Sequence, residues 1–79
     1  MPRMKTVKPA LQEQIERELK NQYGATLRIV DVMNYIGFDR KAATEWVSGL
    51  PFLRTGEKGK RKHYYASAIA EKMYLNTEM

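Results

Sequence analysis

Apolar side chains recur at helical spacing near the start of the chain. Three of them stand four positions apart and form one stripe: Leu11, Ile15 and Leu19. Pro9 suits the first turn of a helix, where a missing N–H loses no partner, and Gly24 suits a left-handed helix end. The pattern therefore predicts a helix over residues 9–23. Two roles are open for its narrow apolar stripe: to cover the hydrophobic core or to bind a second copy of the chain. We favour the first.

Two shorter amphipathic patterns follow, joined by a tight turn. The first has apolar residues at i, i+3, i+4 and i+7: Ile29, Val32, Met33 and Ile36. Gly37 closes this helix, Phe38 is expected to be a buried plug, and Asp39 is a suitable N-cap. The next helix is predicted over residues 40–48, and Gly49 ends it. Two helices joined by a glycine-containing turn match a helix-turn-helix.

The predicted third helix has one apolar and one polar face. Its inward residues are expected to be Ala43, Trp46 and Val47. Its outward residues are expected to be Arg40, Lys41, Thr44, Glu45 and Ser48. An outward face of small and charged residues is typical of a helix that contacts DNA.

The last part of the chain predicts a hairpin and a closing helix. Residues 52–54 and 63–65 resemble two short strands around a glycine-containing loop. Tyr64 and Tyr65 are expected to face opposite sides, because strand side chains alternate. Ser67 is then the expected cap of a fourth helix over residues 68–75. Its inward residues are expected to be Ile69, Ala70 and Met73.

The 79 residues carry a net charge of +5, which is unevenly distributed. Residues 54–62 hold five cations and one acid, or +4, and residues 1–8 add +3 from Arg3, Lys5 and Lys8. The remainder is slightly acidic, at −2. Positive charge concentrated on a nearly neutral body is typical of a protein that binds a polyanion. A solvated loop that aids solubility is the plainer alternative.

These features predict one mostly helical α+β domain over residues 9–79, after a flexible basic arm over residues 1–8. Within it, residues 27–75 form a winged helix-turn-helix with three core helices and a short two-stranded β-wing, and residues 9–23 add an extra N-terminal helix. The chain has no cysteine, no signal-peptide pattern and no apolar run of about 20 residues. We therefore expect a cytoplasmic, nucleoid-associated protein that does not enter the membrane.

Residues 27–75 resemble the MerR-like winged-helix domains of phage excisionases. The matching features are Leu27 to Phe38 with its Ile-Gly end, Trp46, Gly49-Leu50-Pro51, the basic segment Arg54 to Lys62, and Tyr65-Ala66-Ser67. The small terminase subunit of tailed phages resembles the same span. Arg28 departs from the family, which commonly has Ser or Thr as a helix cap there. The helix over residues 9–23 lies outside the usual family core.

The resemblance implies a factor that binds double-stranded DNA cooperatively with further copies of itself, bends it, and influences a recombinase or another phage protein. A transcriptional regulator and a DNA-packaging subunit are alternatives on the same fold. DNA bending and ladder-like cooperative complexes would favour the excisionase type. A protein-interaction module whose basic loop meets an acidic partner or RNA is a third interpretation, from another class.

The residues themselves suggest two DNA-contacting elements. Arg40 can make bidentate contacts to guanine, Thr44 can meet a thymine methyl or a phosphate, and Glu45 can accept from cytosine. For Glu45 we favour an ion pair with Lys41, which stands four positions earlier. The wing supplies charge beside Gly56 and Gly59, which permit close backbone approach. Its candidate contact residues are Arg54, Lys58, Lys60, Arg61, Lys62 and His63. By resemblance one wing residue enters a minor groove, and we favour Arg61.

Other chemistries lack the residues they need. Thr55 to Lys58 is similar to a zinc-finger linker, but the chain has no cysteine and one histidine. Gly56 to Lys60 is too short for a phosphate loop and no Ser or Thr follows its lysine. His63 has no nucleophile or carboxylate near it in the sequence. We therefore expect no enzyme, no cofactor and no metal.

Overall fold

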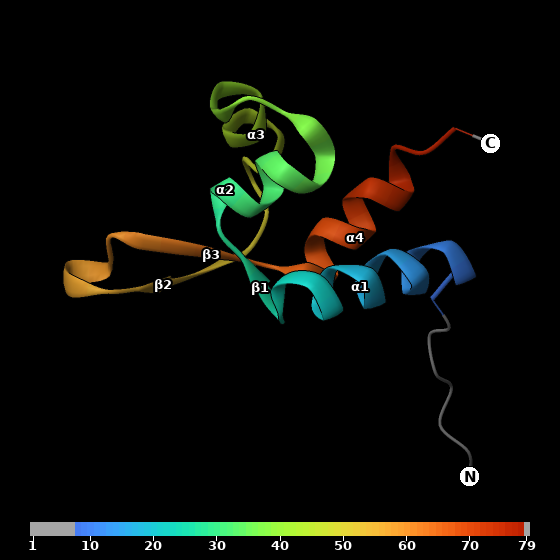
Figure 1. Cartoon of the computed structure of the whole chain (residues 1–79), viewed down its shortest axis with the longest axis horizontal. Coiled ribbons are helices and arrows are strands. Elements are labelled where there is room, and N and C mark those ends of the chain that lie inside the picture. The colour runs from blue at the N-terminus through green and yellow to red at the C-terminus, as the bar shows by residue number, and fades with distance from the viewer. Residues whose placement is uncertain (1–7, 79) are drawn as a thin grey trace, which may run out of the picture.

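Three short strands form one antiparallel sheet, described here from a computed structural model that covers residues 8–78 (Figure 1). The strands are β1 (Thr26–Leu27), β2 (Phe52–Thr55) and β3 (Arg61–Tyr65), in the order β1-β3-β2. β3 pairs on one side with β1, placing Leu27 opposite Tyr64. On its other side it pairs with β2, placing Phe52 opposite the same Tyr64. Tyr64 thus lies in the middle of the sheet.

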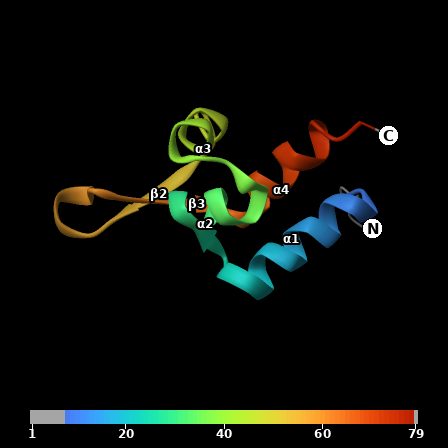
Figure 2. The same ribbon diagram turned by 45° about the horizontal axis from the view of Figure 1, so that its top comes forward.

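Helices occupy most of the rest of this small α+β fold. In the part of the chain that the structure describes, the α-helices are α1 (Ala10–Tyr23), α2 (Ile29–Val32), α3 (Arg40–Trp46) and α4 (Ala66–Leu75). A π-helical turn, η1 (Met33–Gly37), continues α2, and a 3₁₀ turn, η2 (Glu57–Gly59), forms the tip between β2 and β3. The β2–β3 hairpin extends from the body at the end opposite the start of α1 (Figures 1 and 2). No helix among residues 8–78 is long and apolar enough to cross a membrane.

The hydrophobic core lies where α1, α4 and the α2–α3 segment meet. Its largest fully buried side chains are Leu19, Leu27, Ile69, Val32 and Val47. Ile15 and Leu19, from the predicted stripe of α1, are buried, and α1 packs along α4. The prediction that this stripe covers the core is confirmed.

A polar contact also joins α4 to α3. The Lys72 ammonium donates to the Trp46 carbonyl and lies 4.8 Å from the Trp46 ring centroid.

The predicted end of α1 is confirmed, whereas its start is at Ala10 because Pro9 is the N-cap. Two further helix boundaries need correction. α3 ends at Trp46 rather than Ser48, because Val47–Gly49 form a turn in which Leu50 N donates to the Val47 carbonyl. α4 begins at Ala66, since Ala66 N donates to the Ala25 carbonyl at 2.9 Å directly after β3. Ser67 therefore lies in the first turn and is not the cap.

Phe38 and Trp46 are only partly buried and pack together with ring centroids 6.2 Å apart.

The sheet also differs from the predicted two-stranded wing. β1 is a third strand that the sequence analysis did not predict, and β2 and β3 extend to Thr55 and Arg61. Arg61 and Lys62 therefore belong to a strand and not to a loop. The alternation of the two tyrosines is confirmed, because Tyr64 is 8% exposed and Tyr65 is 38% exposed.

Lys8 forms an ion pair, although the sequence assigned it to a loose arm whose remaining residues lie outside the described range. Lys8 Nζ lies 2.5 Å from Glu16 Oε1, and Lys20 Nζ lies 2.8 Å from Glu16 Oε2. The Glu16 side chain is only 10% exposed. Hydrogen bonds from Lys20 and then Lys8 lower the pKa of Glu16 below its ordinary value of 4.5.

Glu16→Gln is expected to lower the free energy of unfolding at pH 7 by about 1 kcal/mol, since it removes both ion pairs. The pKa of Glu16 is lower in the folded than in the unfolded protein. The contribution of the ionised Glu16 side chain to the free energy of unfolding is therefore complete above about pH 4.5. It is lost as the pH falls through the folded-state pKa. Urea denaturation of both proteins from pH 7 to pH 2 measures this. Glu13→Gln is the control, because Glu13 is exposed. If Glu16→Gln lowered the free energy of unfolding as much at pH 2 as at pH 7, the prediction would be contradicted.

Candidate functional site

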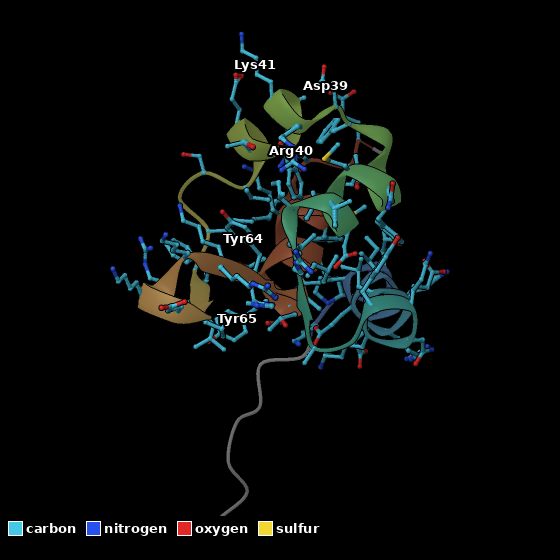
Figure 3. All side chains as sticks on the ribbon, turned by 60° about the vertical axis from the view of Figure 1, so that its left-hand side comes forward. Asp39, Arg40, Lys41, Tyr64 and Tyr65 are labelled. Carbon is cyan, nitrogen blue, oxygen red and sulfur yellow. The ribbon has the colours of Figure 1, made fainter. Side chains whose placement is uncertain are left out.

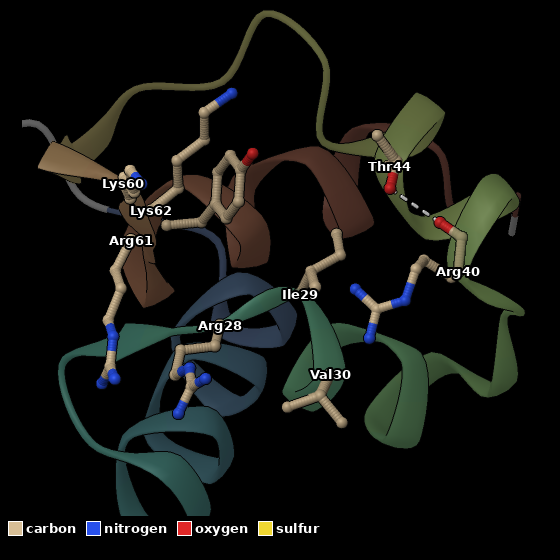
Figure 4. A pocket seen from close by; sticks show the side chains of 9 residues that line it. Arg28, Ile29, Val30, Arg40, Thr44, Lys60, Arg61 and Lys62 are labelled. Atoms are coloured by element: carbon tan, nitrogen blue, oxygen red, sulfur yellow. Dashed lines mark hydrogen bonds between the residues drawn. The ribbon is translucent and has the colours of Figure 1, made fainter. Parts of the chain in front are cut away.

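One open depression on the surface gathers cationic side chains from three elements (Figure 4). It has a volume of about 350 Å³ and lies between the start of α2, the exposed face of α3, and β3. Its lining residues are Arg28, Ile29, Val30, Arg40, Thr44, Lys60, Arg61, Lys62 and Tyr64. Every formal charge in this set is positive, and there are five of them. We call this surface the basic depression.

Arg40 and Thr44 reach the basic depression because α3 is fixed at its start and along its inner face. Asp39 caps the helix, with its Oδ1 accepting from Ala42 N at 2.8 Å. Ala43 is fully buried and orients the opposite face outward. Arg40 and Thr44 then lie one turn apart on the exposed face. The Thr44 hydroxyl donates to the Arg40 carbonyl at 2.7 Å.

The β2–β3 hairpin holds its cations on an ordered tip. Gly56 and Gly59 have φ of 81° and 64° and allow the chain to reverse. A Cβ on Gly56 would lie 3.2 Å from Arg61 Cγ, so glycine also leaves room for the Arg61 stem. Arg54 Nη1 donates to the Gly59 carbonyl at 3.3 Å and braces the tip. The tip is therefore a defined turn.

Phe52 organises two cations on one face of the hairpin. Arg54 and Lys62 are partners in the β2–β3 register. The Arg54 guanidinium lies 5.2 Å and the Lys62 ammonium 5.0 Å from the centroid of the Phe52 ring. Both distances allow cation–π attraction, which offsets part of the repulsion between the two like charges.

Arg28 is the main contributor that the sequence analysis missed. It precedes α2 in an extended conformation, and its backbone N donates to Asp31 Oδ2 at 3.0 Å. Asp31, at the third position of α2, thus satisfies the backbone N–H of the N-cap residue Arg28, which has arginine where the family commonly has Ser or Thr. This arrangement leaves the Arg28 side chain exposed at the basic depression. A cation directly before the second helix was the only signal for it.

The structure brings together five of the eleven predicted site residues: Arg40, Thr44, Lys60, Arg61 and Lys62. The other six do not line the basic depression: Lys41, Glu45, Ser48, Arg54, Lys58 and His63. Figure 3 shows Lys41 pointing away from the body, whereas Arg40 turns toward it. Ile29, Val30 and Tyr64 line the basic depression and were not predicted as site residues. For Ile29, the helical spacing of the apolar residues indicated the core.

The six outlying residues have individual surroundings. Lys41 and Glu45 are both exposed, and within residues 8–78 no ion pair joins them, so the ion pair predicted between them is wrong. Ser48 is exposed in the turn after α3. Lys58 is exposed at the hairpin tip with φ of 59°, a left-handed conformation. His63 is half-buried and faces Leu53 across the register.

A second polar cluster joins α1 to the π-helical turn. The Tyr35 hydroxyl donates to Glu18 Oε2 at 3.0 Å, and the Tyr35 ring meets Tyr23 edge to face at 6.1 Å. Burial and then the bond to Glu18 raise the pKa of Tyr35 above 10.0. Within residues 8–78 no group of three or more His, Cys, Asp or Glu residues is placed to hold a metal ion.

The basic depression is therefore an exposed surface of concentrated positive charge on a small α+β fold. Comparisons of the chain with models of protein families, with curated proteins and with solved structures found no match in any of the three. The resemblance to excisionase-type winged helices therefore stays a prediction from the sequence.

Proposed function

We propose that this protein binds double-stranded DNA as a winged helix-turn-helix, with α3 as the recognition helix and the β2–β3 hairpin as the wing. The observation that carries the proposal is that Arg40 and Thr44 of α3 line the same depression as Lys60, Arg61 and Lys62 of the hairpin. A recognition helix and a wing contact one duplex only if they share a face. Arg28 extends the positive surface between them.

The dimensions support this geometry. α3 has seven residues, or about 10 Å along its axis, and an α-helix about 10 to 12 Å in diameter fits a major groove about 12 Å wide. β2 has four residues, or about 13 Å, which reaches beyond the depression toward neighbouring phosphates. In this arrangement Arg40 contacts a guanine edge, and the outward Lys41 contacts the backbone. The hairpin cations neutralise phosphates, with Arg61 entering the minor groove.

The sequence resemblance supports an excisionase-like factor as the biological role, with transcriptional regulation and DNA packaging as alternatives on the same fold. No catalytic role is part of the proposal, because His63 is half-buried on β3 with no carboxylate hydrogen-bonded to it among residues 8–78.

Salt dependence of DNA binding tests the proposed function. Fluorescence anisotropy of a labelled random-sequence duplex, titrated with the full chain at increasing salt, gives log K against log salt. With about six phosphates neutralised, we expect a slope of about −5. No binding at about 50 mM salt would contradict the proposal and favour a module whose basic loop meets an acidic protein.

A further inference from the structure

The hydroxyl proton of Thr44 is already engaged within the protein. Thr44 Oγ1 donates to the Arg40 carbonyl at 2.7 Å, and Figure 4 shows the hydroxyl turned toward that carbonyl. A threonine hydroxyl has a single proton to donate. The phosphate oxygens of DNA are acceptors, so Thr44 has no proton for them while this bond persists.

The same hydrogen bond selects the group that Thr44 presents to a ligand. A β-branched side chain has few allowed rotamers on a helix, and the back-bond to the i−4 carbonyl fixes one of them. With the hydroxyl proton turned to the backbone, this exposed side chain presents its γ-methyl, and its oxygen can only accept hydrogen bonds. Val30, 39% exposed, adds further methyl groups to the lining of the basic depression.

In a major groove, the chemical partner of such a methyl is the C5-methyl of thymine, which no other DNA base carries. Thr44 lies four residues after Arg40, or about 6 Å along the helix axis. Base pairs rise by about 3.4 Å, so the two side chains are about two base pairs apart. An arginine and a methyl at this spacing suit a short site that contains both a guanine and a thymine.

We propose that Thr44 is a specificity-determining residue that recognises a thymine through its γ-methyl and makes no phosphate contact. This inference rests on the proposed function and deepens it. It names one base that the bound duplex contains and the atom that recognises it.

Two matched variants separate the methyl from the hydroxyl. A duplex is first selected from a randomised pool with the full chain, and each thymine is then replaced singly by deoxyuridine, which lacks only the C5-methyl. We expect one position at which uridine weakens binding about four-fold, the effect of one buried methyl. Thr44→Val keeps the methyl and should retain this uridine effect. Thr44→Ser keeps the hydroxyl and should abolish it.

Two other results would overturn the inference. Binding weakened by Thr44→Val but unchanged by Thr44→Ser would assign the contact to the hydroxyl. A selected duplex with no enriched thymine, or none sensitive to uridine, would show that no methyl is recognised. A chain that retards no duplex at all would instead contradict the proposed function, so the two failures are distinguishable.

Discussion

Replacing Lys60 and Arg61 together by alanine is expected to weaken binding to duplex DNA roughly 10- to 100-fold at moderate salt. Both residues line the basic depression. We expect Lys60 to neutralise one phosphate and Arg61 to displace about one further counterion from within the minor groove. Two lost contacts should also flatten the slope of log K against log salt by about 1.8, since each phosphate contributes about 0.9. Binding should weaken with every sequence, because neither contact reads a base edge in the major groove. Anisotropy titrations at several salt concentrations measure both quantities.

A matched control removes the same charge from another surface. Arg17→Ala with Lys20→Ala also deletes two cations, but both lie on α1, beside a pocket separate from the basic depression. We expect this control to change DNA affinity less than about three-fold. If the two double variants weaken binding equally, net charge alone drives association and the hairpin has no special role.

Leu19→Ala is expected to lower the free energy of unfolding by about 3 to 4 kcal/mol, the range for a fully buried leucine. Leu19 has no exposed surface and lies in the core that α1 and α4 cover. A domain of this length has a total stability of only about 4 to 12 kcal/mol. Urea denaturation followed by circular dichroism measures the loss. Leu75→Ala is the control, because Leu75 is 72% exposed and should change stability by less than about 0.5 kcal/mol.

A small effect of Leu19→Ala would show that α1 packs loosely on the rest of the fold. It would then favour the other interpretation of the α1 stripe, in which this face binds a second copy of the chain. The structure supports the larger effect, since Ile15 beside Leu19 is also buried.

The elements that the sequence predicted correctly are those with a local signal. The spacing of Leu11, Ile15 and Leu19 is sufficient for α1, and Asp39 after Gly37 locates the start of α3. β1 was missed because two residues carry no periodicity, and Thr26–Leu27 becomes a strand only by pairing with residues 64 and 65. The start of α4 depends in the same way on Ala25, 41 positions before Ala66.

The sequence predicted the positive charge of the candidate site, but only part of the spatial arrangement of its residues. Cations clustered over residues 54–62 indicated the hairpin, and the outward face of α3 indicated Arg40 and Thr44. No sequence pattern separates Arg40, which turns toward the body, from Lys41, which points away (Figure 3). Nor does a sequence show that Arg28, directly after β1, joins residues 60–62, which are 32 to 34 positions later, in the basic depression. These relations depend on tertiary packing.

Chemical-shift mapping during titration with a short duplex tests most directly whether α3 and the hairpin contact the same DNA. The measurement follows the backbone amide signals of the ¹⁵N-labelled chain. We predict the largest shifts together at residues 28–30, 40–44 and 60–62, with little change along α1. Shifts confined to α1 and α4, or to the hairpin without α3, would contradict the shared binding face.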